Sequence, residues 1–207
     1  MISKNKITGD ILPVMECFYS IQGEGSHTGK AAFFIRLAGC DVGCHWCDVK
    51  ESWDKNEHAE REVSDLVQEA KASGTSIVII TGGEPAMYSL TTLTKALKKE
   101  GLAVHLETSG AYTIDGEFDW ICVSPKKTKA PLKESLQMAD ELKVVIYNKD
   151  DFNWAEKNAL GVKEPCKLFL QPEWSKSNIV MPWITEYIKN NLGWIVSLQT
   201  HKYLNIR

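Results

Sequence analysis

The segment Ser76–Pro85, SIVIITGGEP, is a short run of β-branched residues that ends in a polar, glycine-rich turn. Helical patterns flank it on both sides: VSDLVQEAKASG before it, with Gly74 as the stop, and LTTLTKALKKEG after it, with Gly101 as the stop. A strand between two helices is the unit of a parallel sheet, because parallel neighbours need a crossover connection. The sequence therefore predicts an α/β fold.

Further segments have the length and the β-branched or aromatic content of strands, and a third long helix is expected around residues 184–191. These strand segments are Val14–Ile21, Ala31–Ala38, Leu102–Thr108, Asp119–Ser124, Glu141–Ile146, Cys166–Gln171 and Trp194–Gln199. Polar or glycine-rich residues follow most of them, as in AGC, TSG, SPKK, QPEW and QTHK. Ligands bind at this carboxyl edge in parallel sheets and barrels.

About six strands with crossover helices in 207 residues predict one domain, residues 1–207, built as an open, incomplete (β/α)6-type barrel with parallel strands. Its lateral opening would suit a bulky cofactor. The chain has a net charge of -3 and only three arginines, so no basic stripe for nucleic acid is expected. It has no apolar run of membrane-spanning length, and residues 1–13 lack the apolar core of a signal sequence. We therefore expect a cytoplasmic protein without membrane or nucleic-acid partners.

Three cysteines are crowded into the loop expected after residues 31–38. In RLAGCDVGCHWCDVKESW, Arg36–Trp53, they are Cys40, Cys44 and Cys47, a CxxxCxxC spacing. Cytosolic thiols stay reduced, so this group indicates metal or redox chemistry rather than disulfides. A structural zinc site usually takes four ligands from two separated pairs, and the sequence has no second CxxC. Zinc stays open only as an alternative in which a histidine completes the set: His27, His45 or His58.

A 4Fe-4S cluster fits the spacing for a chemical reason. The cube has four iron corners, so three thiolates leave one iron open to a bidentate ligand such as an amino acid. With Trp46 just before the third cysteine, FIRLAG before the triplet and TGGEP after the next crossover, the sequence resembles the radical S-adenosylmethionine superfamily. The resemblance implies that Cys40, Cys44 and Cys47 bind the cluster and that the methionine amine and carboxylate of S-adenosylmethionine chelate the fourth iron.

The same resemblance places S-adenosylmethionine at the carboxyl ends of the strands. The turn Gly82–Pro85 is the expected site for its methionine amine, because small residues permit close approach and a carboxylate accepts from an ammonium group. Ser109 and Ser124 are expected near the ribose or carboxylate, although isolated serines are often helix caps or turn formers. Lys126 would either neutralise the cofactor carboxylate or be a solvated surface lysine. The full expected set is Trp46, Asp48, Gly82, Gly83, Glu84, Ser109, Ser124, Pro125, Lys126 and Gln171.

Three more segments resemble one family within this superfamily, 7-carboxy-7-deazaguanine synthase. They are FYSIQGEGSHTGKAAFFIRLAGC (residues 18–40), LQPEW (170–174) and SLQTHKYLNIR (197–207), and the resemblance spans about residues 17–207. It implies a substrate site in which a guanidinium pairs with a carboxylate and amide or carboxylate groups bind the pterin edge. The implied substrate-binding residues are Ile21, Gln22, Gly23, Glu24, Arg36, Thr81 and Arg207.

The implied reaction begins when one electron from the reduced cluster splits S-adenosylmethionine into methionine and a 5'-deoxyadenosyl radical. That radical takes a hydrogen from C6 of 6-carboxy-5,6,7,8-tetrahydropterin, and the ring contracts with loss of ammonia to 7-carboxy-7-deazaguanine, a step of queuosine biosynthesis and hence of tRNA modification. Two alternatives stay open. A glycyl-radical enzyme activating protein shares the cysteine spacing but does not explain SIQGEG, and a non-catalytic iron-sulfur or zinc module does not need TGGEP, TSG and SPK at one edge.

One position departs from the family pattern. The second residue after the third cysteine is usually a threonine or serine that coordinates magnesium, and here it is Val49, which has no oxygen to offer. Asp48 is an adjacent candidate, but a turn or a hydrogen bond near the cluster is its expected role. Mg²⁺ is therefore expected to be held through substrate and water only, or to be unnecessary, with a weaker magnesium dependence. The resemblance also implies a flavodoxin or ferredoxin electron donor and a homodimer. Trp174, Met181 and Trp183 are either interface or core residues.

Overall fold

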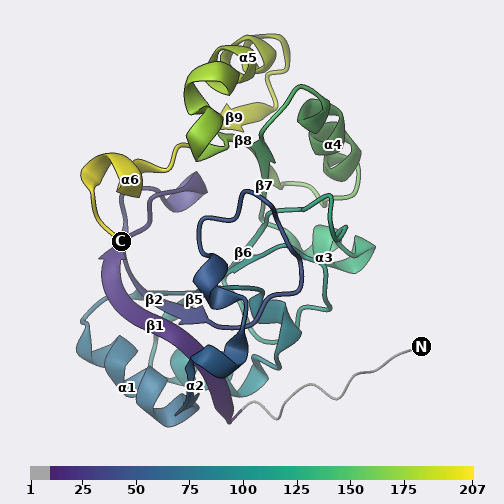
Figure 1. The fold of residues 1–207 in the computed structure, drawn as a ribbon. Helices are drawn as coiled ribbons and strands as arrows, with labels where there is room; N and C mark the ends of the chain where they lie inside the picture. The colour runs from purple at the N-terminus through teal and green to yellow at the C-terminus, as the bar shows by residue number, and fades with distance from the viewer. Residues whose placement is uncertain (1–9) are drawn as a thin grey trace.

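The computed structural model describes residues 10–207, and within them nine strands form one sheet (Figure 1). The first nine residues, on which the expected lack of a signal sequence partly depends, lie outside this range. The strand order is β3-β1-β2-β4-β5-β6-β7-β8-β9. The strands are β1 (Ile11–Ile21), β2 (Ala31–Leu37), β3 (Ala59–Glu62), β4 (Ile77–Gly82), β5 (Ala103–Thr108), β6 (Trp120–Val123), β7 (Glu141–Ile146), β8 (Lys167–Pro172) and β9 (Trp194–Val196).

The predicted parallel sheet is confirmed from β2 to β9. Each neighbouring pair in the order β2-β4-β5-β6-β7-β8-β9 is parallel, so their carboxyl ends share one edge. The other end of the sheet is antiparallel: β1 forms a hairpin with β2, in which Ile21 is opposite Ala31, and β3 pairs with β1. β3 was not predicted, because its sequence AERE has no apolar residue larger than alanine and pairs only at an edge. Together these strands make an open, mostly parallel α/β sheet.

Six helices connect or cover the strands in the described range. They are α1 (Val63–Ala72), α2 (Thr91–Lys99), α3 (Lys133–Met138), α4 (Asp150–Ala159), α5 (Ser177–Asn190) and α6 (Thr200–Leu204). α1 and α2 confirm the predicted helices, and the glycines after them take positive φ angles, +73° at Gly74 and +78° at Gly101. α5 begins seven residues before the predicted position 184 and contains Pro182, which obscured its start in the sequence. No helix in residues 10–207 is long and apolar enough to cross a bilayer.

Apolar side chains from the helices and strands form the main core. Leu66 of α1 and Leu93 of α2 are fully buried in one cluster with Ile80, Leu106 and Leu142 of the sheet. Burial of one such side chain contributes about 1.5–3 kcal/mol. In Figure 1, α1 and α2 lie at the β1–β2 end of the molecule, while α4 and α5 lie at the β8–β9 end. The core therefore holds the shared carboxyl edge of the strands in place.

The C-terminal segment runs back from β9 to β1. The backbone N–H of Thr200 donates to the Gly23 carbonyl at 2.9 Å, and the hydroxyl of Ser20 donates to the Arg207 carbonyl at 2.7 Å. Arg207 also pairs with Glu16 of β1 at 3.2 Å. Figure 1 shows the C-terminus beside the end of β1. Residues 197–207 thus connect β9, at one edge of the sheet, with β1, which lies next to the strand at the other edge.

Two imidazoles, one of them in the loop after β1, lie in contact at a tilted angle. His27, in the short 3-10 helix Gly25–His27, has its ring centroid 4.5 Å from that of His105 on β5 and 4.7 Å from that of Trp120 on β6. Both ring nitrogens of His27 are buried without a hydrogen-bond partner in the described residues. Burial, with a smaller effect of the neighbouring His27, lowers the pKa of His105 to about 4. The folded protein therefore favours the neutral imidazole.

The stability of the protein is expected to fall as the pH drops from 6.5 toward 4. The unfolded chain takes up a proton at His105 near its ordinary pKa of 6.5, whereas the folded state does so only near 4. This difference in pKa contributes about 3 kcal/mol to the free energy of unfolding. The contribution is fully present above pH 6.5 and is lost as the pH falls to 4. Urea unfolding of wild type and His105→Gln between pH 7.5 and 4.5 measures it. Equal pH slopes for the two proteins would contradict the assignment, because the remaining titrating groups are common to both.

Candidate active site

A cavity of about 570 Å³ lies at the carboxyl edge of the parallel strands. Its volume is within the usual range of ligand sites. Every predicted site residue except Pro125 lines it. The carbonyl of Pro125 instead accepts a hydrogen bond from the indole N–H of Trp154, on α4, at 3.4 Å. The two groups of residues predicted for cofactor and substrate therefore share one cavity.

The cysteine triplet lies in the loop that follows β2. Cys40, Cys44 and Cys47 are free, half-buried thiols that line the cavity. Burial raises the pKa of Cys40 and of Cys44. The charge of a neighbouring cysteine raises each pKa further: that of Cys44 for Cys40, and that of Cys47 for Cys44. The loop is tied at its base, because Gly39 N–H donates to the Ser52 carbonyl at 2.6 Å. Three soft sulfur ligands thus face the cavity from one short segment.

This donor set fits a cluster better than a single zinc ion. Within the described residues, no three Cys, His, Asp or Glu side chains converge on a point where one metal ion would bind. Thiolates that each hold a different iron of a cube do not need to converge in that way. The arrangement therefore agrees with a 4Fe-4S cluster held at three corners.

The glycine-rich turn after β4 packs directly against the cysteine loop. Gly83 N–H donates to the Leu37 carbonyl and Glu84 N–H to the Gly39 carbonyl, both at 2.9 Å. A Cβ at Gly83 would lie 2.3 Å from the Gly39 carbonyl oxygen, so only glycine allows this approach. Gly82 is also tight, with φ +151° and a hypothetical Cβ 2.3 Å from the Leu37 carbonyl oxygen. Thr81, the residue before it, lines the cavity.

Glu84 uses its carboxylate inside the fold. It is 1% exposed and accepts hydrogen bonds from the Thr108 hydroxyl at 2.5 Å, from Ser109 N–H at 2.8 Å and from the Ser109 hydroxyl. Ala86 N–H donates to it at 3.0 Å. Glu84 and Ser109 therefore fix the ends of β4 and β5 relative to each other, in addition to any contact that they make with a ligand.

A lysine and an aromatic ring lie near the cysteines. Lys126 donates to the carbonyl and the hydroxyl of Ser124 at 2.5 and 2.7 Å, and its ammonium is 5.6 Å from the centroid of Trp46. Burial lowers the pKa of Lys126, and the Cys44 thiol opposes this shift. Gln171, at the end of β8, is 4% exposed and accepts from the Ser197 hydroxyl at 2.8 Å. Lys126 is thus a cavity residue rather than a solvated surface lysine.

Two arginines share one carboxylate at the β1 side of the cavity. Glu16 pairs with Arg36 at 2.9 Å and with Arg207 at 3.2 Å. The Arg36 guanidinium also lies 5.6 Å from the centroid of Phe18. The loop Ile21–Glu24 continues from the same strand and lines the cavity. The structure therefore brings the predicted residues Arg36, Arg207 and this loop to one wall.

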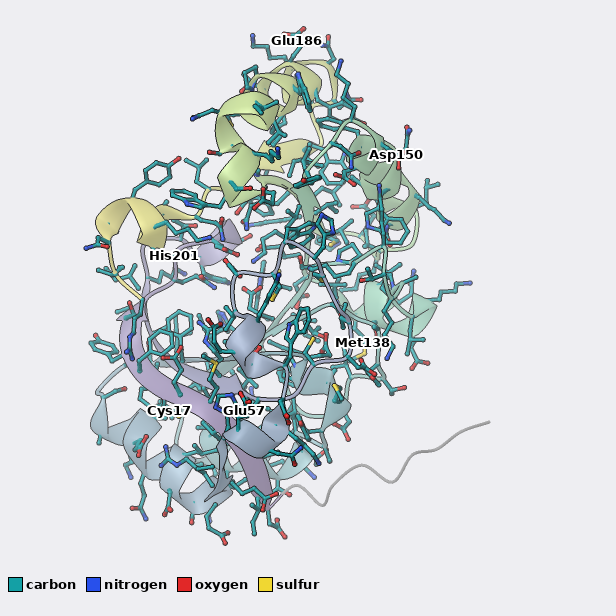
Figure 2. All side chains as sticks on the ribbon, viewed as in Figure 1. Cys17, Glu57, Met138, Asp150, Glu186 and His201 are labelled. Carbon is teal, nitrogen blue, oxygen red and sulfur yellow. The ribbon has the colours of Figure 1, made fainter. Side chains whose placement is uncertain are left out.

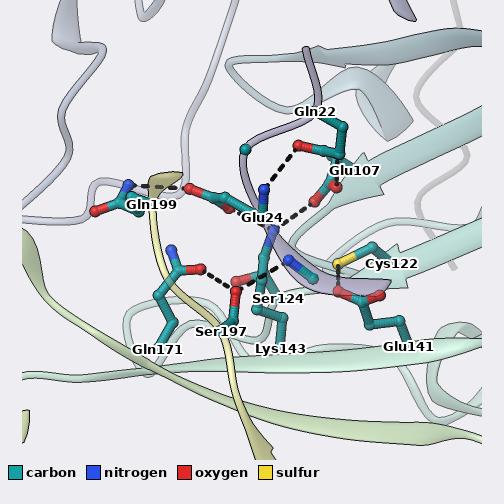
Figure 3. A network of polar contacts seen from close by, with 12 residues as sticks. Gln22, Glu24, Glu107, Cys122, Ser124, Glu141, Lys143, Gln171, Ser197 and Gln199 are labelled. Carbon is teal, nitrogen blue, oxygen red and sulfur yellow. Dashed lines mark hydrogen bonds and ion pairs between the residues drawn. The ribbon is translucent and has the colours of Figure 1, made fainter. Parts of the chain in front are cut away.

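The cavity also contains two charged residues that the sequence did not predict. Figure 3 shows Glu107 of β5 and Lys143 of β7 joined to Gln22 and Glu24. Gln22 donates to Glu107 at 3.1 Å, and Lys143 donates to Glu24 at 2.6 Å and to Glu107 at 2.9 Å. The sequence contained one signal: Glu107 and Lys143 are charged residues in predicted strands, and buried parallel strands rarely contain a charged residue without a partner. The partner of each residue, however, could not be named before the fold was known.

The short helix α6 and the residue before it contribute three more residues to the cavity or its rim. Gln199, just before α6, donates to Glu24 at 3.0 Å, and Lys202 pairs with Asp48 at 2.9 Å. Figure 2 shows His201 on α6. A Cβ at Gly23, in the loop after β1, would lie 2.2 Å from its Nδ1, so His201 packs on that loop. The C-terminal segment therefore joins the cysteine loop to the loop Ile21–Glu24.

Comparisons with known proteins agree with this site. Residues 34–122 match the family model described as the radical SAM superfamily. The 7-carboxy-7-deazaguanine synthase of Flavobacterium psychrophilum is 56% identical over 96% of this chain and 94% of that protein, and the one of Synechocystis sp. is 49% identical over 94% and 93%. The crystal structure of QueE from Escherichia coli superposes with a TM-score of 0.80 at 31% identity, covering 91% of this chain and 93% of that one. The chain therefore belongs to the 7-carboxy-7-deazaguanine synthase family of the radical SAM superfamily.

Proposed function

We propose that the protein converts 6-carboxy-5,6,7,8-tetrahydropterin to 7-carboxy-7-deazaguanine with release of ammonia, a step of queuosine and 7-deazapurine biosynthesis. One observation supports this most strongly: a single cavity contains three cysteines at one wall and, at another, the Gln22, Glu24 and Arg36 set suited to a carboxylated pterin. A protein that only activates a glycyl-radical enzyme, whose substrate is a polypeptide, has no need of such a pterin-shaped donor and acceptor set.

Cys40, Cys44 and Cys47 would hold the cluster, and the Gly82–Glu84 turn with Ser124 and Lys126 would surround S-adenosylmethionine. When bound, the reduced cluster and this cofactor supply the one-electron cleavage that starts radical chemistry at C6 of the pterin. Lys126 places a positive charge 5.6 Å from Trp46, where the anionic end of a cofactor would be stabilised. The glycines at the end of β4 let this turn pack directly against the cysteine loop, which would keep the cofactor close to the cluster.

The substrate would bind beside Arg36 and the charged cluster of Glu24, Glu107 and Lys143. Arg36 offers a guanidinium to the pterin carboxylate in exchange for part of its pairing with Glu16. Gln22 and Glu24 offer amide and carboxylate groups to the pyrimidinone edge. Four residues of the C-terminal segment line the cavity and would help to orient the substrate and exclude water: Gln199, His201, Lys202 and Arg207.

The direct test is anaerobic reconstitution with iron, sulfide, reductant, S-adenosylmethionine and the carboxytetrahydropterin, followed by mass detection of product. Formation of 7-carboxy-7-deazaguanine is expected. Production of 5'-deoxyadenosine without the deazaguanine acid would retain the superfamily chemistry and contradict the substrate. A protein that loads no iron would contradict both.

Magnesium dependence is expected to be weak, because Val49 supplies no oxygen ligand. Asp48, the adjacent candidate, is engaged by Lys202 at 2.9 Å and by Gln199 at 3.4 Å, so a metal ion would have to displace an ammonium group. Val49→Thr is expected to make activity respond more steeply to Mg²⁺. Turnover measured after chelation and over a magnesium titration, in wild type and variant, checks this. Wild-type activity that vanishes without Mg²⁺ and returns sharply on its addition would argue against weak dependence.

Two partners and a compartment complete the proposal. A flavodoxin or ferredoxin would reduce the cluster, and a reducing cytoplasm suits both free thiols and iron-sulfur chemistry. A homodimer is supported by apolar side chains exposed on α5 and β9, among them Ile179 at 54% and Ile195 at 46%. Trp174 is 40% exposed, whereas Trp183 packs against the core.

A further inference from the structure

Lys143 is a buried ammonium group that the proposed chemistry has not used. It lies on β7 with its side chain 5% exposed, and its Nζ is 2.6 Å from Oε2 of Glu24 and 2.9 Å from Oε2 of Glu107. Figure 3 shows it between the two carboxylates, which come from the loop after β1 and from β5. Across residues 10–207, no other lysine or arginine is within ion-pair distance of Glu24 or Glu107. The ammonium group of Lys143 therefore forms ion pairs with both carboxylates.

The second oxygen of each carboxylate meets an amide donor. Glu107 Oε1 accepts from Gln22 at 3.1 Å, and Glu24 Oε1 accepts from Gln199 at 3.0 Å. Burial raises the pKa of Glu24, but the charge and hydrogen bond of Lys143 together with Gln199 outweigh it, so that the pKa falls to about 2. Protein groups thus surround both acids with donors. The lone pairs left for a ligand can only accept hydrogen bonds.

Removal of the ammonium would change this pattern. Two carboxylates in one poorly solvated site cannot both stay ionised, so one takes up a proton at neutral pH. Burial already raises the pKa of Glu107 with Lys143 in place, which identifies Glu107 as the acid that would be protonated first. A protonated carboxyl donates a hydrogen bond. Glu107 would then offer the ligand a hydrogen-bond donor, where it now offers only acceptors.

We propose that Lys143 is a positioning residue that determines which pterins the cavity accepts, by keeping Glu24 and Glu107 as a pair of acceptors. This inference rests on the proposed function and concerns its substrate class. The aminopyrimidinone edge of a pterin presents N–H donors at its 2-amino group and ring nitrogen. A 2-oxo pteridine presents a carbonyl in place of the amino group, so that two acceptors would face each other, which costs affinity.

Other titratable groups surround this cluster and set the pH range of a test. They are Cys122 on β6, Glu141 on β7, Lys126 after β6 and His201 on α6. Burial raises the pKa of Cys122 well above its usual range, so this thiol is neutral. Burial lowers the pKa of His201 below 6.5, so its imidazole is neutral above that pH. Cys122 and His201 therefore stay neutral from pH 6.5 to 8.5. Burial lowers the pKa of Lys126, and because every variant in the test retains this lysine, differences between the variants report on the carboxylates.

The test is calorimetric binding of 6-carboxy-5,6,7,8-tetrahydropterin under anaerobic conditions, without S-adenosylmethionine, in buffers of different ionisation enthalpy. Wild type is expected to bind without proton exchange, equally at pH 6.5 and 8.5, and to prefer the pterin to its 2-oxo analogue. Lys143→Met is expected to bind roughly 10- to 100-fold more weakly at pH 6.5, as for a lost hydrogen bond to a charged group. It should release a proton on binding, improve as the pH rises, and discriminate less against the 2-oxo analogue.

Two variants keep the test decisive if Lys143→Met is unstable. Lys143→Met/Glu107→Gln removes the surplus charge, and it is expected to fold and to bind without dependence on pH. Lys71→Met, at an exposed pair with Glu100, is the matched control and should behave as wild type. Unchanged affinity and no proton release in Lys143→Met, or pH-dependent binding by the double variant, would overturn the proposal. A wild-type protein that cleaves S-adenosylmethionine yet binds no pterin would instead refute the proposed substrate, and this inference with it.

Discussion

Cys44→Ala is expected to yield a folded protein that retains no 4Fe-4S cluster and forms neither 7-carboxy-7-deazaguanine nor 5'-deoxyadenosine. Cys44 lies between Cys40 and Cys47 at the cavity wall, and burial raises its pKa, so its proton is released only when a metal binds the sulfur. Two thiolates hold two corners of a cube and leave the others exposed to water. Iron and sulfide analysis after anaerobic reconstitution, with the visible absorption of the cluster and mass detection of both products, measures the effect.

Cys166→Ala is the matched control for this experiment. Its thiol is half-buried, lies 3.7 Å from the Lys167 carbonyl and does not line the cavity. This variant is expected to load iron and to turn over as wild type does. If Cys44→Ala kept a full cluster while its circular dichroism stayed native, a different side chain would have to hold that corner. The assignment of Cys40, Cys44 and Cys47 would then be wrong.

The parts of this fold that depend on neighbours in the sequence were predictable. The strand β4, the helices on either side of it and their glycine stops follow from periodicity and turn chemistry within about twelve residues. The cysteine spacing and the GGEP turn are equally local. Because parallel strands end at one edge, their polar ends had to meet, and the cavity contains the predicted Gln22, Arg36 and Lys126 together.

What could not be predicted depends on pairs that are far apart in the sequence. Lys143 pairs with Glu24, 119 positions away in the sequence, and with Glu107, 36 positions away. No feature of the sequence near these residues predicts that they pair. The return of residues 197–207 to β1 is also long-range, since Ser20 bonds to Arg207 across 187 positions. The antiparallel direction of β1 likewise depends on the hairpin with β2 rather than on its own composition.

Gly83→Ala is expected to destabilise the protein by about 1–3 kcal/mol, as overpacking of a tight contact does. It should also weaken cluster retention. The new Cβ would lie 2.3 Å from the Gly39 carbonyl oxygen and 2.9 Å from Cys40 Cβ. These are backbone and near-backbone atoms, and Gly39 has φ +96°, so the loop cannot relax by a rotamer change. To make room, the loop that carries Cys40 must shift. Urea unfolding and the rate of cluster bleaching in air measure the two effects.

Gly193→Ala separates this effect from the general consequence of adding a methyl group. A Cβ at Gly193 meets no atom within 4 Å, and its φ is not in the left-handed region. The control is therefore expected to keep wild-type stability or to gain slightly, because alanine restricts the unfolded chain. Equal stability and equal cluster lifetime for the Gly83 and Gly193 variants would show that the turn after β4 does not position Cys40. In that case the close approach of the two loops would be incidental to the cluster, and the cysteine loop alone would have to hold its shape.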